Sequence, residues 1–181
     1  SYNGSTKCFS VFSKITAPAY KRKSPLNSIR FRPARDEECP ALSDMMLRSK
    51  AHWDYDADFI EACRTDLTIT PDWLRENAGF VAERENTVVG FFGISTEGET
   101  AHVEHFFVER DAIGHGVGKV MWTEYLRQAR LRKARRIEIE AEPHAEAFYR
   151  HMGAVTIGQC PSTVFAGRML PLMEVTLTPL V

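Results

Sequence analysis

Hydrophobic and polar residues recur along the chain with two distinct periods. Stretches that alternate at every second residue are typical of strands, and stretches with an apolar residue every three to four positions are typical of helices. The first pattern predicts strands at Ser28–Arg32, Gly79–Ala82, Val88–Ile94, Ala101–Val108, Arg136–Ala141, Val155–Gly158 and Met169–Leu177. The second predicts helices at Asp36–Lys50, Asp56–Leu67, from Thr70-Pro71 onward, at Val117–Leu131 and at Pro143–Met152.

This order of elements predicts an α/β (α+β) fold around one mixed sheet. The strand Ala101–Val108, the helix Val117–Leu131 and the strand Arg136–Ala141 form a strand–helix–strand crossover. Such connections place their two strands side by side and parallel. We therefore expect these strands to be parallel or splayed neighbours, with helices on both faces of the sheet.

The first 28 residues differ from the rest of the chain. They are rich in serine and lysine and contain no aspartate or glutamate. A leader or a flexible arm has such a composition, and an arm packed on the domain is the alternative. We expect residues 29–181 to form a single domain, a length that one domain commonly has.

Composition excludes several classes of protein. The chain is 44% hydrophobic and 26% charged, with a formal net charge of −1, which does not indicate a nucleic-acid binder. It has no apolar run of about 18 residues, so no membrane-spanning helix is expected. The cysteines form no CxxC pair and lie at no zinc-like spacing from a histidine, so we expect reduced thiols, no metal site and a cytoplasmic location. They are Cys8, Cys39, Cys63 and Cys160.

The segment IGHGVGKV, residues 113–120, carries the clearest chemical signal. Three glycines lie between a predicted strand and the predicted helix that starts at Val117. A helix N-terminus attracts phosphate through free N–H groups, and glycine lets the ligand approach the backbone. Gly114, Gly116 and Gly118 therefore predict a pyrophosphate site to which Lys119 adds charge; a glycine-rich turn without a ligand is the alternative.

Two familiar phosphate-binding motifs do not fit this segment. The Walker pattern needs four residues between its first glycine and the GK pair, followed by serine or threonine. Here three residues separate Gly114 from Gly118-Lys119, and Val120 follows. The dinucleotide pattern GxGxxG fails as well, because the spacing is GxGxG.

Three segments resemble the GCN5-related N-acetyltransferases, the GNAT superfamily. HVEHFFVERDAIGHGVGKVMW is similar to that family's fourth strand, pyrophosphate loop and third helix. RRIEIEAEPHAEAFYRHMGAVTIG is similar to its fifth strand, fourth helix and entry to the sixth strand, and RMLPLMEVTL to its last strand. The family's loop pattern is Q/R-x-x-G-x-G/A, and Ile113 stands where the glutamine or arginine belongs.

The resemblance implies a fold, an activity and a cofactor. The fold is a mixed, mostly antiparallel sheet whose fourth and fifth strands splay apart, flanked by helices. The chain would be an enzyme, an acyltransferase that binds acetyl-CoA between the splayed strands. Its expected cofactor-binding residues are Phe106, Phe107 and Val108 on the strand and Ile113, Gly114, His115, Gly116, Val117, Gly118 and Lys119 in the loop.

The resemblance also indicates catalytic candidates. Tyr149 matches the family's tyrosine near the cofactor sulfur, and packing beside Phe148 is its alternative role. His102 falls on the family's best-known base position, and Glu104, one step closer to the reactive end, is our preferred base or ammonium ligand. Side chains alternate along a strand, so we expect His102 and Glu104 to share a face with Phe106 and His105 to point to the other face.

The acceptor pocket is expected where the first two helices meet. His52, Trp53, Tyr55 and Asp56 gather there, and aromatic rings with an acid suit a cationic amine. The expected reaction is direct transfer of acetyl to a primary amine of a small molecule. A protein lysine or N-terminus as acceptor, or a non-catalytic acyl-CoA-binding sensor, are the alternatives. Dimers are common in the family, often through the last strands, so a homodimer is the partner the resemblance implies.

Overall fold

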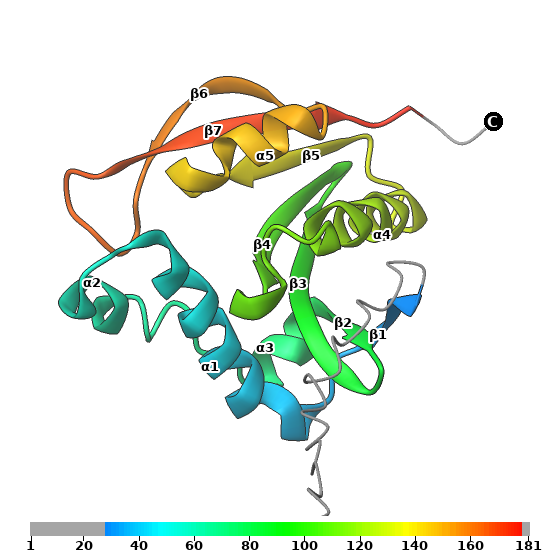
Figure 1. The fold of residues 1–181 in the computed structure, drawn as a ribbon. Coiled ribbons are helices and arrows are strands. Elements are labelled where there is room, and N and C mark those ends of the chain that lie inside the picture. The colour runs from blue at the N-terminus through cyan, green and yellow to red at the C-terminus, as the bar shows by residue number, and fades with distance from the viewer. Residues whose placement is uncertain (1–27, 179–181) are drawn as a thin grey trace, which may run out of the picture.

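The computed structural model describes residues 28–178 of the 181-residue chain, and these form one seven-stranded sheet flanked by helices (Figure 1). The strand order is β1-β2-β3-β4-β5-β7-β6. Every neighbouring pair is antiparallel except β4 and β5. The strands are β1 (Arg30–Pro33), β2 (Ala78–Arg84), β3 (Thr87–Glu97), β4 (Thr100–Val108), β5 (Arg136–Glu140), β6 (Val155–Pro161) and β7 (Met169–Thr176).

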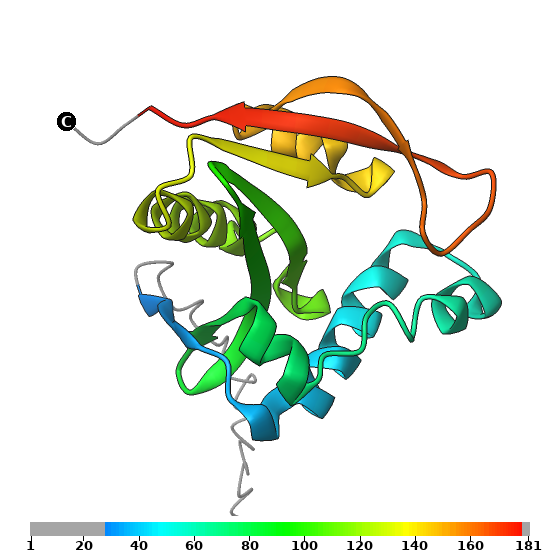
Figure 2. The same ribbon diagram turned by 180° about the vertical axis from the view of Figure 1, so that it is seen from behind.

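The parallel strands β4 and β5 pair over a short stretch only. Thr100 lies opposite Arg136, and the pairing ends where His102 lies opposite Glu138. Beyond that point the two strands diverge, and the gap between them widens toward the C-terminal ends of both strands (Figures 1 and 2). The prediction of a parallel, splayed pair is confirmed.

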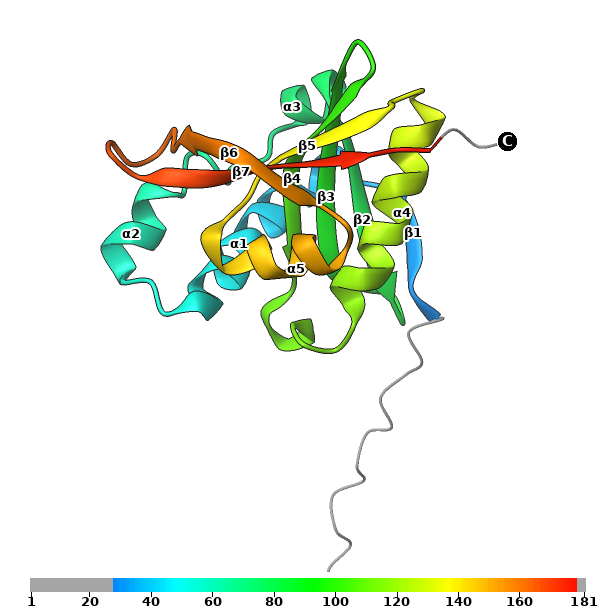
Figure 3. The same cartoon turned by 90° about the horizontal axis from the view of Figure 1, so that it is seen from above.

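Helices cover both faces of the sheet, as the sequence predicts. Figure 3 shows α4 on one side of β3 and β4 and α1 on the other. The helices are α1 (Cys39–Lys50), α2 (Ala57–Ala62), α3 (Pro71–Glu76), α4 (Val117–Leu131) and α5 (Glu146–His151). Single 3₁₀ turns lie at Asp36–Glu38, Ala51–Trp53, Arg110–Ala112 and Pro143–Ala145.

Two hydrophobic cores follow from this layering. Adjacent residues of β3 point to opposite faces, so Phe92 packs with Trp122 and Tyr125 of α4 while Phe91 packs with the α1 side. Both phenylalanine side chains are fully buried. Because β3 and β4 are covered on both faces, they hold the groups that they carry in fixed positions.

The second predicted helix is shorter than expected. The helix predicted over Asp56–Leu67 is observed as α2, which ends at Ala62. Beyond it the backbone tightens: the Cys63 N–H donates to both Phe59 and Ile60, and residues 63–67 form turns. Cys63 and Leu67 are still buried, because the turns keep these apolar positions on the core side.

A β-bulge in β4 changes the expected alternation of side chains. Gly93 of β3 pairs with His105 and Ile94 pairs with Val103, which leaves Glu104 without a partner. Such an extra residue shifts the following side chains to the other face. The prediction that His102 and Glu104 share a face with Phe106 is therefore wrong. Phe106 packs with α4 and α5, whereas His105 packs against Trp73 of α3.

Glu104 lies on the same side as His105. A Cβ built on Gly93 would meet Trp73 of α3, and it would lie 3.5 Å from the Glu104 Cβ. The carboxylate and the imidazole of two consecutive residues thus both face the side of the sheet covered by α1 and α3.

Three further expectations can be placed on the described residues. None of their helices is long and apolar enough to cross a membrane. Cys39, Cys63 and Cys160 carry free thiols, whereas Cys8 lies outside the described residues. The predicted arm lies outside them as well, apart from Ser28.

Candidate functional site

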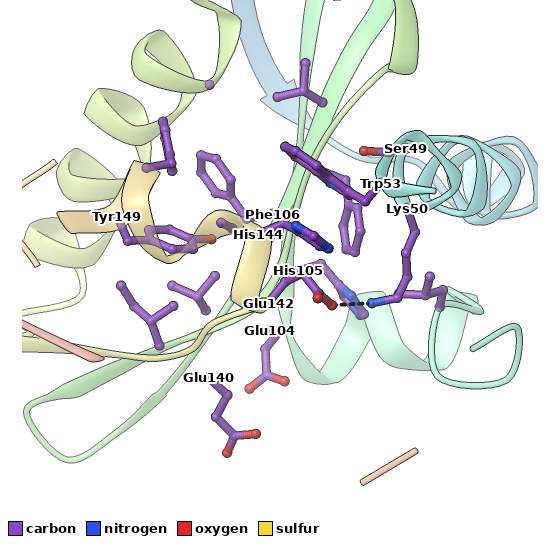
Figure 4. A pocket seen from close by; sticks show the side chains of 18 of the residues that line it. Ser49, Lys50, Trp53, Glu104, His105, Phe106, Glu140, Glu142, His144 and Tyr149 are labelled. Atoms are coloured by element: carbon purple, nitrogen blue, oxygen red, sulfur yellow. Dashed lines mark hydrogen bonds and ion pairs between the residues drawn. The ribbon is translucent and has the colours of Figure 1, made fainter. Parts of the chain in front are cut away.

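A cavity of about 1270 Å³ opens where β4 and β5 diverge. Its walls are formed by both strands, by the loop before α4, by α5, and by the end of α1 (Figure 4). Tyr149 and Phe106 point into it from one side, and Lys50 and Trp53 from the other. Segments far apart in the sequence thus meet at one opening in the sheet.

The loop before α4 has a backbone conformation that favours glycine. Gly114 has φ +78° and Gly116 has φ +82°, in the left-handed region that side chains with a Cβ rarely adopt. Gly118, one residue into α4, is needed for close packing: a Cβ there would lie 3.3 Å from the Phe148 ring of α5. The three glycines therefore have local structural reasons to be glycine.

The same loop presents backbone N–H groups. Gly116 precedes α4 and makes no side-chain cap. The Val120 N–H donates to the Gly116 carbonyl at 3.4 Å, and the amides of Val117, Gly118 and Lys119 precede it in the first turn, where no intrahelical acceptor exists. The start of α4 thus offers free donors and a positive dipole end.

Most of the predicted loop residues line the cavity. Five of the seven do so, whereas His115 is exposed outside it and Val117 is fully buried in the core. The five are Ile113, Gly114, Gly116, Gly118 and Lys119. All three predicted strand residues, Phe106, Phe107 and Val108, also line the cavity.

Tyr149 of α5 reaches the cavity from a buried position. Its ring packs edge-on against Phe106 at 6.0 Å and against Trp122 at 5.4 Å. Among the described residues its hydroxyl has no hydrogen-bond partner, and it points into the opening (Figure 4). Burial raises the pKa of Tyr149 well above its usual range, so the hydroxyl keeps its proton at neutral pH.

Glu104 and His102 also line the cavity, each with a polar neighbour. The Ser95 hydroxyl of β3 donates a hydrogen bond to Glu104 Oε1. His102 Nδ1 lies 3.7 Å from Glu138 Oε1, where β4 and β5 are still paired. Glu104 is exposed and lies beyond His102, the last β4 residue that pairs with β5. Its carboxylate is therefore set further into the opening than the His102 ring.

A charged group that we call the Glu142 cluster borders the side of the cavity away from the loop before α4. It consists of Lys50, Tyr55, Glu142 and Arg168. Lys50 Nζ donates to Glu142 Oε2 at 2.8 Å, and Arg168 Nη2 donates to Glu142 Oε1 at 2.7 Å. The Tyr55 hydroxyl donates to Glu142 and accepts from Arg168.

Glu142 stays ionised at the centre of this cluster. Burial alone would raise the pKa of its carboxyl, but hydrogen bonds from Lys50 and Tyr55 and the charges of Lys50 and Arg168 outweigh burial and lower the pKa. The cluster joins α1 to the β6–β7 hairpin, which lies beside α2 in Figures 1 and 2. Stacking of Phe59 on Phe165 at 4.3 Å reinforces that contact.

Of the four predicted acceptor-binding residues, Trp53 lines the cavity. Its ring stacks on His144 at 5.2 Å, with an interplanar angle of 1°. His52 packs edge-on against Trp53, and Tyr55 belongs to the Glu142 cluster. Asp56 accepts a hydrogen bond from the Phe59 N–H at 2.7 Å and so caps α2.

Several residues at the cavity were given no site role by the sequence analysis. Lys50, Trp73, Glu142, His144 and Arg168 all border the cavity or its charged wall, and so does His105, which the sequence analysis placed on the face opposite Glu104. One signal for Glu142 and His144 was present: both follow directly after a predicted strand of the splayed pair. For Arg168, 26 residues further along, no local pattern indicates a role at this site.

Comparisons with known proteins identify the family. A model of the acetyltransferase (GNAT) domain matches residues 58–177, about two thirds of the chain. The chain therefore belongs to the GNAT acetyltransferase family. No curated protein matches the chain.

Solved structures agree on the fold. A GCN5-related N-acetyltransferase from Rhodopseudomonas palustris is similar with a TM-score of 0.71 at 20% identity, covering 83% of this chain and 96% of that one. The PaiA N-acetyltransferase from Thermoplasma acidophilum, solved with coenzyme A, has a TM-score of 0.65 at 15% identity and coverages of 83% and 99%. Ard1 from Thermoplasma volcanium has a TM-score of 0.63 at 17% identity, with the same coverages.

Proposed function

We propose that this member of the GNAT family transfers an acetyl group from acetyl-CoA directly to a primary amine of a small molecule. One observation carries the proposal: a single cavity joins a glycine loop suited to phosphate with a wall rich in carboxylates. Two substrates of opposite charge can therefore occupy the cavity at the same time.

The residues present fit coenzyme A. The amides at the start of α4, with Gly114 and Gly116 in a left-handed conformation, suit a pyrophosphate, and Lys119 at the cavity wall adds a positive charge. Beyond His102, β4 has no β5 neighbour, so the amides of Phe106–Val108 can bind an extended arm as an added strand would. When bound, acetyl-CoA supplies an activated acetyl group whose C–S bond breaks as the new C–N bond forms.

Three residues of this chain are proposed to take part in the proton transfers of the reaction. Glu104 takes a proton from the acceptor ammonium, which frees the nitrogen lone pair for attack, and His102 is the second candidate for this task. Tyr149, protonated and pointing into the cavity, donates its proton to the departing sulfur. The ammonium loses two protons on its way to the amide: the first goes to Glu104, which releases it to solvent, and the second leaves the nitrogen after attack and returns through water to Tyr149. The thiol keeps the proton that Tyr149 gave, so the cycle balances with one proton released.

Charge at the cavity wall supports a cationic acceptor. Five carboxylates line the cavity against two lysines, and one lysine, Lys50, is already paired with Glu142. The carboxylates are those of Asp66, Glu104, Glu138, Glu140 and Glu142. Trp53 and Trp73 add aromatic faces that attract ammonium groups.

Thermal unfolding with acetyl-CoA, with ATP and NAD as controls, tests the first half of the proposal. At about 100 times its dissociation constant a ligand stabilises the folded state by about 2.7 kcal/mol, so we expect a clear rise in melting temperature with acetyl-CoA alone. An equal rise with ATP or NAD, or no rise with acetyl-CoA, contradicts the assignment of the loop.

Thiol release from acetyl-CoA in the presence of primary amines tests the second half. We expect turnover with small diamines or arylalkylamines, and a flattened pH profile of kcat/KM in Glu104→Gln. An unaltered profile in Glu104→Gln and a changed one in His102→Gln would give the base role to His102. Binding of acetyl-CoA without turnover of any amine would instead favour an acyl-CoA sensor.

A further inference from the structure

We infer that His105 is an acceptor-binding residue whose imidazole accepts a hydrogen bond from the ammonium group of the amine substrate. This inference rests on the proposed function, because it names a contact within the same cavity. It gives a role to a side chain that the alternation predicted from the sequence placed on the face opposite Glu104.

The position of His105 is a consequence of the bulge at Glu104. The bulge puts the carboxylate and the imidazole on the same side of β4, and both side chains line the cavity. Figure 4 shows His105 below the Trp53–His144 stack and the Glu104 carboxylate further down, beside Glu140. An ammonium group placed between the two side chains can therefore contact both.

The surroundings of His105 are aromatic. Its ring centroid lies 5.1 Å from Trp73, 6.2 Å from Phe91 and 6.3 Å from Phe107. Of these rings only Trp73 carries a conventional donor, its indole N–H, and among residues 28–178 no hydrogen bond to either ring nitrogen of His105 is formed. A largely enclosed polar ring without a partner is costly unless a ligand or water completes it.

The ring nitrogens are open to the cavity. In the described part of the chain, the side-chain polar atoms that are sealed off without a partner are Trp122 Nε1, Tyr125 OH and Arg130 Nε. His105 is not among them, although it has no hydrogen-bond partner within residues 28–178, so its nitrogens remain reachable from the cavity that it lines. The missing partner can thus come from a bound molecule.

Because His105 is uncharged, a hydrogen-bond donor can serve as the missing partner of its ring. Burial lowers the pKa of His105 to about 4, so at neutral pH the ring is uncharged and one nitrogen carries a lone pair. An ammonium group offers three N–H donors, which is enough for the imidazole and for the Glu104 carboxylate at once. A protonated histidine would repel the same group, so the aromatic enclosure that keeps His105 neutral favours a cationic substrate.

A pair of variants separates hydrogen bonding from packing. His105→Phe keeps a planar ring among Trp73, Phe91 and Phe107 but removes both nitrogens, whereas His105→Gln keeps an acceptor atom. With the amine that the wild-type protein turns over best, we expect His105→Phe to raise the KM for amine about 10- to 100-fold, as the loss of a hydrogen bond to a charged group does. The KM for acetyl-CoA should stay within about threefold, and His105→Gln should recover part of the loss.

A binding measurement decides the question even without turnover. The protein labelled with ¹⁵N-histidine and saturated with coenzyme A is titrated with phenethylamine, and with 2-phenylethanol as the uncharged analogue. The imidazole signals of His105 are identified by their absence in His105→Phe. We expect the unprotonated ring nitrogen of His105 to shift on addition of the amine and to respond much less to the alcohol.

The outcomes separate this inference from the proposed function. An unchanged amine KM in His105→Phe, or His105 signals that do not respond to the amine, overturns the role of His105 while leaving acetyl transfer intact. Failure of acetyl-CoA to bind, or of any amine to be acetylated, contradicts the proposed function, and the titration still reports whether His105 contacts an amine.

Discussion

The two ends of the cavity are built in opposite ways. The loop end consists of residues 113–119, seven consecutive positions whose N–H groups and φ angles are proposed to bind the pyrophosphate. The Glu142 cluster brings together side chains from α1, the segment after α1, the end of β5 and the β6–β7 hairpin. One end depends on backbone geometry that a short local sequence sets, and the other on charges that only the complete fold assembles.

This difference predicts two kinds of failure. Damage to the exposed part of the loop end, residues 114–116, should remove coenzyme A affinity and leave the rest of the fold in place, because these three residues are not part of the core. Damage to the Glu142 cluster should weaken stability first, because the cluster holds α1 and the β6–β7 hairpin together. Variants that break one end at a time test whether the two ends are independent.

The largest effect is expected from Gly116→Val. A valine at φ +82° is strained, and its branched side chain would occupy the space beside the free amides of α4. We expect coenzyme A affinity to fall by about 100-fold or more, equivalent to about 2.7 kcal/mol. Isothermal titration with coenzyme A measures the loss.

Gly98→Val is the matched control for this variant. Gly98 has φ +57° in the turn between β3 and β4, and no atom lies within 4 Å of a Cβ built there. The same kind of backbone strain is thus introduced away from the cavity. If both variants lose coenzyme A affinity equally, the loss reflects strain and not a phosphate site.

The next effect concerns the region between the two ends, where Tyr149 lies. Tyr149→Phe keeps the ring packed against Phe106 and Trp122 and removes the hydroxyl. Because general acid catalysis is commonly worth about 100-fold or more, we expect kcat to fall by about that factor. Coenzyme A affinity should not change, and steady-state kinetics with titration calorimetry measures both quantities. An unchanged kcat would make Tyr149 a packing residue of the α4–α5 core.

The same contrast explains what could be predicted from the sequence. The parallel pair and the position of the glycine loop could be predicted because each depends on a local pattern or on its order in the chain, and Tyr149 was predicted from the resemblance of its segment to the GNAT fourth helix. The bulge was missed, since one unpaired residue, Glu104, leaves the hydrophobic pattern of β4 almost unchanged while it moves Phe106 to the other face. Arg168 was missed because its partners Tyr55 and Glu142 are distant in sequence, and a pairwise ionic contact leaves no periodic signal.

The smallest effect on coenzyme A binding, and the clearest on stability, is expected from Glu142→Gln. The neutral amide leaves Lys50 and Arg168 close together without their shared counter-charge, and the side chain of Glu142 is only 21% exposed. Loss of one partner of a buried ionic group costs about 3 kcal/mol, which lowers the melting temperature by about 6–12 °C in a domain of this size. Glu99→Gln is the control, because its pair with Arg135 is 67% exposed on both sides and should contribute less than about 1 kcal/mol.

The lowered pKa of Glu142 also predicts how the stability of the fold depends on pH. The folded-state pKa of Glu142 lies below 4.5, so its ionised form stabilises the fold fully above that pH, and the contribution is lost as pH falls through the lowered pKa. The unfolding free energies of wild type and Glu142→Gln, measured by urea denaturation between neutral and acidic pH, should therefore differ most above pH 4.5 and converge in acid. A constant difference across this range would mean that glutamine disturbs packing and not charge. Loss of coenzyme A affinity together with stability would show instead that the two ends of the cavity are coupled.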